Sequence, residues 1–245
     1  MALKIDHVLT SGVFALDGGE WDVDNNVWIV GDDTEVYIID AAHDAEAIAK
    51  AVGDRKVKGI IATHGHNDHV DAAPLLSKLV DAPVYLHPGD DMLWFDANPT
   101  EKFVEMADGE VFKIAGTELK VLSTPGHSPG SVVLYAEEAG ELFSGDTLFQ
   151  GGPGATGRSY SSFDTIIESL QKRVLDLPAE TVVRTGHGDH TTIGEEAPTS
   201  RSGSSEGTRA CSASQAAPRF AAQRRGRAGR SAAPARGSGS TWKSW

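Results

Sequence analysis

A short histidine-rich segment constrains this chain more than any other feature of its sequence. Residues 63–69 read Thr-His-Gly-His-Asn-Asp-His and directly follow the apolar run Val57–Ala62, which is typical of a buried strand. On an extended loop His64 and His66 can face one metal ion, while Asp68 and His69, one step further along, can turn toward a second. Imidazole and carboxylate groups suit zinc, iron or manganese, and the missing thiolate argues against a purely structural zinc site. We therefore expect a metal site where this strand ends.

Three later positions share that setting, each beside glycine at the end of an apolar run. They are His127 in Pro-Gly-His-Ser-Pro-Gly (125–130), Asp146 in Phe-Ser-Gly-Asp-Thr (143–147) and His187 in Thr-Gly-His-Gly (185–188). Taken singly, a residue of this kind usually belongs to a turn or a cap. Because α/β scaffolds place their sites in the loops at strand ends, we expect the three side chains to join the first cluster.

Strand-like and helix-like patterns alternate along the first half of the chain, and hairpins appear in the second half. We predict strands over 27–30, 35–40, 57–62, 83–86 and 181–185, hairpins over 111–114 with 118–122 and 131–135 with 141–144, and helices over 44–52, 70–79 and 163–175. Hairpins mixed with crossover helices predict an α/β (α+β) fold, a four-layer αββα sandwich of two mixed sheets flanked by helices.

The last 47 residues differ in composition from the rest. Residues 199–245 contain ten Ser, ten Ala, eight Arg and six Gly, and no Leu, Ile, Val or Met. Such a segment cannot offset the entropy cost of its own ordering by apolar burial. We therefore predict a folded domain over 1–198 and a disordered tail over 199–245. The tail is interpreted either as a cloning scar or as the product of a shifted reading frame.

Charge and cysteine content exclude several function classes. Residues 1–198 hold 13 basic and 34 acidic side chains, so a basic face for nucleic acid is not expected. The single cysteine, Cys211, excludes an internal disulfide and a cysteine-rich metal site. Residues 1–14 lack the pattern of a signal peptide, and no window approaches the roughly 18 apolar residues of a membrane span. We expect a cytoplasmic protein with neither a nucleic-acid nor a membrane partner.

In their order and residue types, these motifs resemble those of the metallo-β-lactamase-fold hydrolase superfamily, and within it the glyoxalase II-like (hydroxyacylglutathione hydrolase-like) branch. The resemblance extends from about residue 8 to residue 198. It implies a catalytic domain with two zinc ions per chain, iron or manganese being the alternatives. Carried over by position, the first ion would be held by His64, His66 and His127, the second by Asp68, His69 and His187, and both by a bridging Asp146.

The resemblance also implies a reaction. A metal-bridging hydroxide would attack a thioester or a related activated acyl bond, and the partner would be a small-molecule acyl-thiol or ester. By this resemblance Asp68 and Asp146 would be the catalytic carboxylates, with a minor proton-shuttling role for Asp68. The sequence does not indicate an oligomeric state.

Two departures from the family narrow this reading. True zinc β-lactamases lack a bridging carboxylate such as Asp146, which argues against antibiotic hydrolysis as the native reaction. Glyoxalase II enzymes carry a helical C-terminal domain that helps hold glutathione, and nothing after Pro198 would build one. Two alternatives stay open. One is a lactone or ester hydrolase on the same metal core, and the other is a mononuclear non-haem iron persulfide dioxygenase using His64 or His66, His127 and Asp146.

The remaining polar candidates carry weaker signals. Arg158 and Tyr160 follow the Asp146 loop and are predicted to bind a substrate carboxylate or hydroxyl, since a guanidinium offers a forked set of donors. A surface salt bridge explains Arg158 equally well. The other histidines have no motif around them and are predicted to be surface, turn or polar-loop residues: His7, His43, His87 and His190.

The tail provides the first testable prediction. All seven proposed metal ligands precede residue 199, so deleting residues 199–245 should leave metal content and hydrolysis unchanged or improved. Metal analysis and rate measurements on the truncated chain check this expectation. Loss of the fold on truncation, together with protease resistance of the tail in the full chain, would contradict it.

Overall fold

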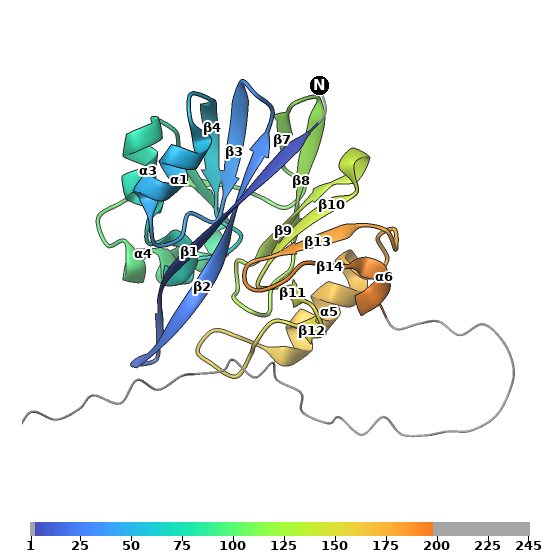
Figure 1. Ribbon diagram of the computed structural model, residues 1–245. Helices are drawn as coiled ribbons and strands as arrows, with labels where there is room; N and C mark the ends of the chain where they lie inside the picture. The colour runs from blue at the N-terminus through green and yellow to red at the C-terminus, as the bar shows by residue number, and fades with distance from the viewer. Residues whose placement is uncertain (1–2, 198–245) are drawn as a thin grey trace, which may run out of the picture.

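Two β-sheets pack face to face, with helices on their outer faces (Figure 1). The structure is a computed structural model that describes residues 3–197. The first sheet has the order β1 (Lys4–Leu16), β2 (Gly19–Gly31), β3 (Glu35–Ile39), β4 (Lys56–Ile61), β5 (Val84–Leu86) and β6 (Val104–Glu105). Strands β1 to β3 are antiparallel and β3 to β6 are parallel, so the sheet is mixed.

The second sheet is also mixed. Its order is β14 (Thr191–Thr192), β13 (Val182–Thr185), β10 (Glu141–Gly145), β9 (Val132–Ala136), β8 (Thr117–Ser123) and β7 (Val111–Ile114). Only β10 and β13 pair in parallel. A separate ribbon joins β11 (Leu148–Phe149) to β12 (Gly152–Pro153).

The helices divide between the two sheets, as Figure 1 shows. Helices α1 (Ala45–Val52), α2 (Asn67–Val70), α3 (Ala73–Val80) and α4 (Asp91–Ala97) lie on the side of the first sheet, and α5 (Phe163–Arg173) and α6 (Ile193–Glu196) on the side of the second. Short 3-10 turns occupy Pro88–Asp90 and Glu137–Ala139. Within residues 3–197 no helix combines the length and apolarity needed to cross a bilayer.

Three apolar layers follow from the alternation of side chains along the strands. On β3, Ile38 packs toward the helices with Leu76 of α3, whereas Ile39 faces the second sheet and shares a central layer with Phe143 of β10. A third layer joins the second sheet to Ile166 and other residues of α5. The predicted four-layer sandwich of two mixed sheets is therefore confirmed.

Strand β1 was not expected from the sequence. It pairs with β2 along its whole length, from Lys4 opposite Gly31 to Leu16 opposite Gly19. Most of its residues are exposed or half-buried, and polar residues interrupt its apolar ones. A long ribbon that extends beyond the core lacks the strong apolar pattern by which buried strands are detected.

The helix predicted over residues 70–79 is present from Ala73 onward as α3, but it is not continuous from Val70. The chain forms α2, which ends at Val70, and starts α3 afresh at Ala73. Pro74 occupies the first turn of α3, where its missing N–H group does no harm but where a preceding helical turn would clash with its ring. The strand expected to be last, β13, is followed by the two-residue β14. The predicted tail lies outside the described residues, so the domain boundary at residue 198 stays a prediction.

A buried carboxylate fastens two loops at the edge between the sheets. Asp90 is fully buried, and its Oδ2 accepts hydrogen bonds from Gly65 N at 2.8 Å and Ser128 Oγ at 2.6 Å. Its Oδ1 accepts from Gly130 N at 2.6 Å. One carboxylate thereby ties the loop after β4 to the loop between β8 and β9, and these are two of the loops that carry the predicted metal ligands.

The second prediction concerns this tie. Asp90→Asn keeps the size of the side chain but turns an NH₂ group toward donors that need an acceptor, so it should lower the free energy of unfolding by about 1–3 kcal/mol. Urea unfolding measures the change. Asp96→Asn on the exposed face of α4 is the control and should stay within about 0.5 kcal/mol of the parent chain. Equal midpoints for the parent and Asp90→Asn would contradict the assigned role.

Candidate metal centre

The seven predicted ligands gather at the carboxyl ends of strands from both sheets. The first segment supplies four of them from the end of β4 and from α2, and the others follow β8, β10 and β13: His64, His66, Asp68, His69, His127, Asp146 and His187. All six besides Asp146 are less than 10% exposed, and the Asp146 side chain is 12% exposed. The structure therefore brings the seven residues together in one cluster, although they come from both halves of the chain.

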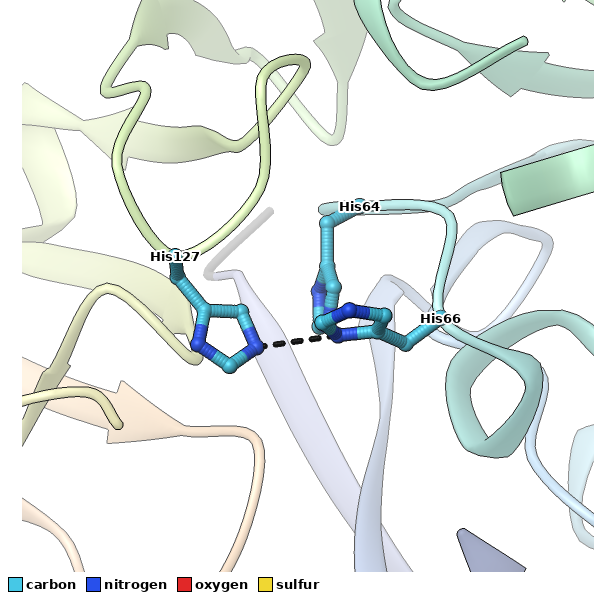
Figure 2. Close-up of side chains that lie close together, drawn as sticks. All are labelled: His64, His66 and His127. Atoms are coloured by element: carbon cyan, nitrogen blue, oxygen red, sulfur yellow. Dashed lines mark hydrogen bonds between the residues drawn. The ribbon is translucent and has the colours of Figure 1, made fainter. Parts of the chain in front are cut away.

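Within this cluster the ligand atoms form three overlapping groups. His64, His66 and His127 make the first, in which Nδ1 of His66 lies 3.0 Å from Nε2 of His127 (Figure 2). The second group is Asp68 with His69 and His187, and the third is His64 with His69 and Asp146. In each group the possible ligand atoms lie within 4.8 Å of one another, so each could hold a metal ion.

Asp146 lies between two of these groups, the triad of His64, His66 and His127 and the triad of Asp68, His69 and His187. Its Oδ2 is 3.6 Å from Nε2 of His127 and 3.5 Å from Nε2 of His187, and its Oδ1 is 3.3 Å from Nε2 of His69. A single carboxylate thus faces both groups, as a bridging ligand must.

Four histidine rings are oriented by oxygen atoms outside the cluster. The Nδ1 atoms of His64 and His69 lie 3.1 Å from Thr63 Oγ1 and from Asp40 Oδ2, respectively. Those of His127 and His187 lie 2.8 Å and 2.7 Å from the carbonyl oxygens of Ala155 and Asp24. Carboxylate and carbonyl oxygens only accept, and Thr63 Oγ1 already donates to Asp40, so each Nδ1 carries the proton that is shared. The Nε2 atoms of His69, His127 and His187 are directed inward, toward Asp146, and are the candidate ligand atoms of these rings.

Four polar atoms at the centre of the cluster have no hydrogen-bond partner, and a cation could take the place of one. Nε2 of His64 and of His66, and Oδ1 of Asp68 and of Asp146, are buried without a hydrogen-bond partner. Buried acceptors of this kind cost about 1–3 kcal/mol each when nothing satisfies them. Since imidazole nitrogen and carboxylate oxygen are the donor atoms preferred by divalent zinc, iron and manganese, the residues fit such an ion.

The charges within the cluster balance. Burial opposes protonation of His69 and His187, but nearby carboxylates outweigh it and raise the pKa of His69 well above its usual value and the pKa of His187 to about 10. Burial and the neighbouring rings lower the pKa of His64 well below its usual value and that of His66 to about 3. Protons on His69 and His187 balance the carboxylates, and a cation that uses both rings has to displace them.

Asp40 is a functional residue that sequence reasoning did not single out. It follows β3, is buried and adopts φ 58°, which is rare for a residue other than glycine. Its Oδ1 accepts from Thr63 N at 2.7 Å, and its Oδ2 contacts both Thr63 Oγ1 and His69 Nδ1. An acidic residue directly after a buried strand was the available signal, the same signal that pointed to Asp146. Asp24 and Ala155 act through main-chain carbonyls and leave no such signal.

Two glycines permit close approach of loops to Asp146. A Cβ atom on Gly186 would lie 2.3 Å from Asp146 Oδ1, and one on Gly154 would lie 1.8 Å from the Asp146 carbonyl oxygen. The chain next to His187 and the loop after β12 can therefore pass directly over this residue. This packing also brings Ala155 to His127.

The predicted substrate residues lie in the loop after β12. Arg158 stacks on Trp21, with its guanidinium carbon 3.8 Å from the ring centroid, and it also lies 5.3 Å from the Phe14 ring. Phe14 in turn lies 5.3 Å from the ring of His66, so Arg158 is two contacts away from the cluster. Tyr160 is 57% exposed.

The remaining histidines divide. His190 is exposed, and His87 accepts a hydrogen bond from Gly89 N within a turn, in line with the predictions. His7 stacks on Trp28 at 4.5 Å and binds Asn26, so it is packed rather than free on the surface. His43 lies in a turn as predicted, but it is not a surface residue: its side chain is 5% exposed and bonded at both ring nitrogens, because β1, which the sequence did not reveal, covers it.

Comparison with known proteins places this geometry in a family. Hydroxyacylglutathione hydrolase GloC of Haemophilus influenzae is 31% identical over 67% of this chain and 85% of its own length. The structure of TTHA1623 in a di-iron-bound form is 33% identical, with a TM-score of 0.65 over 72% of this chain and 94% of that one. BLEG-1, a B3 metallo-beta-lactamase, is 30% identical, with a TM-score of 0.62 over 76% and 95%.

The matching family model spans residues 21–187, which is more than half of the chain and includes all seven residues of the cluster. This range agrees with the resemblance inferred from the motifs, and the similarity to GloC supports the glyoxalase II-like branch. The chain belongs to the metallo-beta-lactamase superfamily.

Proposed function

We propose that this chain is a dinuclear metal-dependent hydrolase that cleaves a thioester or a related activated acyl bond. The observation that carries the proposal is the convergence of histidine nitrogens on either side of Asp146, with four of the five rings held at Nδ1 by an oxygen atom outside the cluster. The similarity to GloC supports an acyl-thiol as the substrate class.

Two triads and a shared carboxylate divide the work of holding metal. The first ion would be held by His64, His66 and His127, the second by Asp68, His69 and His187, with Asp146 between them. Zinc is the proposed metal, and iron is supported by the di-iron form of TTHA1623. Bound divalent ions supply a water with a pKa near 7 and a Lewis acid for the substrate carbonyl.

The side chains of this protein contribute charge and position. Burial disfavours the ionised form of Asp68, yet His69 and His187 hold its pKa at about 2, so Asp68 stays ionised at neutral pH. A carboxylate with so low a pKa is a poor proton carrier, which leaves Asp68 mainly as a ligand and a source of negative charge. Asp146, whose pKa the same two histidines hold well below its usual value despite burial, has the same role.

Arg158 and Tyr160 form the proposed subsite for the polar end of the substrate. Ser159, between them, donates from N and Oγ to Asp17 at 3.0 Å and 2.6 Å, which fastens this loop to the tip of the β1–β2 hairpin. Arg158 is exposed and stacks on Trp21, and its guanidinium offers a forked set of donors to a substrate carboxylate.

The persulfide dioxygenase alternative needs one iron ion, two histidines and Asp146. It gives no role to the second triad, and for this reason two ions are favoured. A purified, metal-analysed sample assayed with thioesters, lactones, a β-lactam and persulfides separates the candidates. We expect the highest kcat/KM with a thioester, whereas one iron per chain and oxygen-dependent persulfide consumption would replace the proposal.

The third prediction concerns the ligands. His127→Ala should remove most of the metal and nearly all hydrolysis, because it takes a ligand from the first triad. Asp146→Asn should lower the hydrolysis rate strongly but the free energy of unfolding only slightly, because it weakens the proposed shared ligand. Elemental analysis and initial rates measure both effects. His190→Ala, the loss of an exposed histidine, is the control and should match the parent chain. Normal metal content and rate in His127→Ala would refute the assignment.

The fourth prediction concerns Arg158. Arg158→Ala should raise KM about tenfold for an acyl-thiol that carries a carboxylate, with little change in kcat, because a partly exposed charge-assisted hydrogen bond is lost. Arg158→Lys, which keeps the charge but not the planar fork, should recover part of the loss. The same substrate as its uncharged methyl ester is the control. An equal rise in KM for the charged and uncharged substrates would contradict a carboxylate subsite.

A further inference from the structure

A line of three hydrogen-bonded side chains leads from the second triad toward the protein surface. Asp71, at the end of α2, accepts at Oδ1 from His43 N at 2.7 Å, and its Oδ2 lies 2.9 Å from His43 Nδ1. His43 Nε2 lies 2.9 Å from Asn25 Oδ1. Asn25 Nδ2 donates to Asp68 Oδ2 at 3.2 Å. The line joins β2, the turn before α1 and the end of α2.

The orientation of the Asn25 amide follows from its neighbours. On the inner side it faces Asp68 Oδ2, which only accepts, and Nε2 of His69 and His187 at 3.3 Å and 3.5 Å. The NH₂ group points inward, where it donates to the Asp68 carboxylate, and Oδ1 points outward toward His43.

The outward Oδ1 of Asn25 contacts the His43 ring. His43 Nε2 lies 2.9 Å from Asn25 Oδ1, and His43 Nδ1 lies 2.9 Å from Asp71 Oδ2, so both ring nitrogens are engaged. The His43 side chain is 5% exposed, whereas that of Asp71 is 35% exposed.

The fold holds His43 in place at some conformational cost. His43 has φ 61°, which side-chain-bearing residues rarely adopt, and its main-chain N–H bonds the same carboxylate as its ring. Strand β1 closes over the ring at Gly12, where a Cβ atom would lie 2.2 Å from Nδ1. Two contacts from Asp71 and one glycine thus fix a ring that touches none of the proposed ligands directly.

We propose that Asn25, held by the His43–Asp71 pair, is a positioning residue for Asp68 and thereby sets the affinity of the second metal triad. The proposal rests on the proposed dinuclear function. It assigns to Asn25 the fixing of one carboxylate oxygen, so that Oδ1 of Asp68, which has no hydrogen-bond partner, is presented to the ion. Partners of this kind typically change metal affinity by 10- to 100-fold.

Imidazole NMR and zinc competition test the proposal on the full chain. Two-dimensional ¹H–¹⁵N spectra of the rings, assigned by single His→Gln changes, report loading of the first triad through His127 and of the second through His187. Zinc is titrated against a chelator of known affinity. Asn25→Ala and His43→Ala should each weaken zinc at the second triad by 10- to 100-fold, with less than a threefold change at the first. Asn25→Asp, which cannot donate to Asp68, should be no better than Asn25→Ala.

A matched control separates positioning from local destabilisation. Asp44, next to His43, caps α1 by accepting from Ala47 N at 2.9 Å, and it takes no part in the line of hydrogen bonds. Asp44→Ala should lower stability while leaving both zinc affinities unchanged. In the metal-free chain the ring resonances of His43 should shift in Asn25→Ala, because the contact of Nε2 with Asn25 Oδ1 is lost.

The outcomes keep the two proposals apart. If the parent chain binds two zinc ions and Asn25→Ala and His43→Ala bind them equally well, the positioning role is wrong and the dinuclear function stands. Equal weakening at both triads, reproduced by Asp44→Ala, also overturns the positioning role. A parent chain that loads neither triad refutes the proposed function itself, while the ring resonances of His43 still report on the hydrogen-bonded line.

Discussion

Seven histidine and aspartate side chains are crowded into one largely buried place, and this crowding is the constraint on which the rest of the structure depends. Imidazole lone pairs and carboxylate oxygens repel one another when they are confined away from water. Two features offset this repulsion. Nearby carboxylates raise the pKa of His69 and His187 and so favour their protonation, and the buried atoms that have no hydrogen-bond partner suit a cation. Such an arrangement needs support from the surrounding structure, and the Nδ1 contacts of four of the five rings supply it.

The two-sheet architecture provides that external support. The strands that carry the cluster end at one edge, where β4 of the first sheet meets β10 and β13 of the second. Buried acids then connect the loops: Asp40 joins Thr63 to His69, and Asp90 joins Gly65 to Gly130. Neither acid is a proposed ligand, yet both determine where ligands lie. The sandwich is thus a frame that brings loops from both halves of the chain to a single point.

Much of this could be predicted from the sequence, and the failures have physical causes. The candidate ligands could be named from the sequence because each histidine or aspartate follows an apolar run. The two sheets could be predicted because the apolar runs and the turns between them can be read directly from the sequence. Strand β1 and the break before α3 depend on pairing beyond the core and on the position of Pro74, which apolar periodicity does not capture. Asn25 and His43 carry no motif, and their roles appear only when β1, β2 and the turn before α1 come together. Support from main-chain carbonyls, as at Asp24 and Ala155, has no side-chain signature at all.

Anomalous X-ray scattering from crystals grown with zinc tests the central claim most directly. Two peaks are expected about 3.5–4 Å apart. One should lie among His64, His66 and His127 and the other among Asp68, His69 and His187, with Asp146 in contact with both. Nitrogen to zinc distances should be about 2.0–2.1 Å. A single peak with the second triad left hydrogen-bonded to itself would contradict the dinuclear account, and ions bound only elsewhere on the protein would contradict the whole assignment.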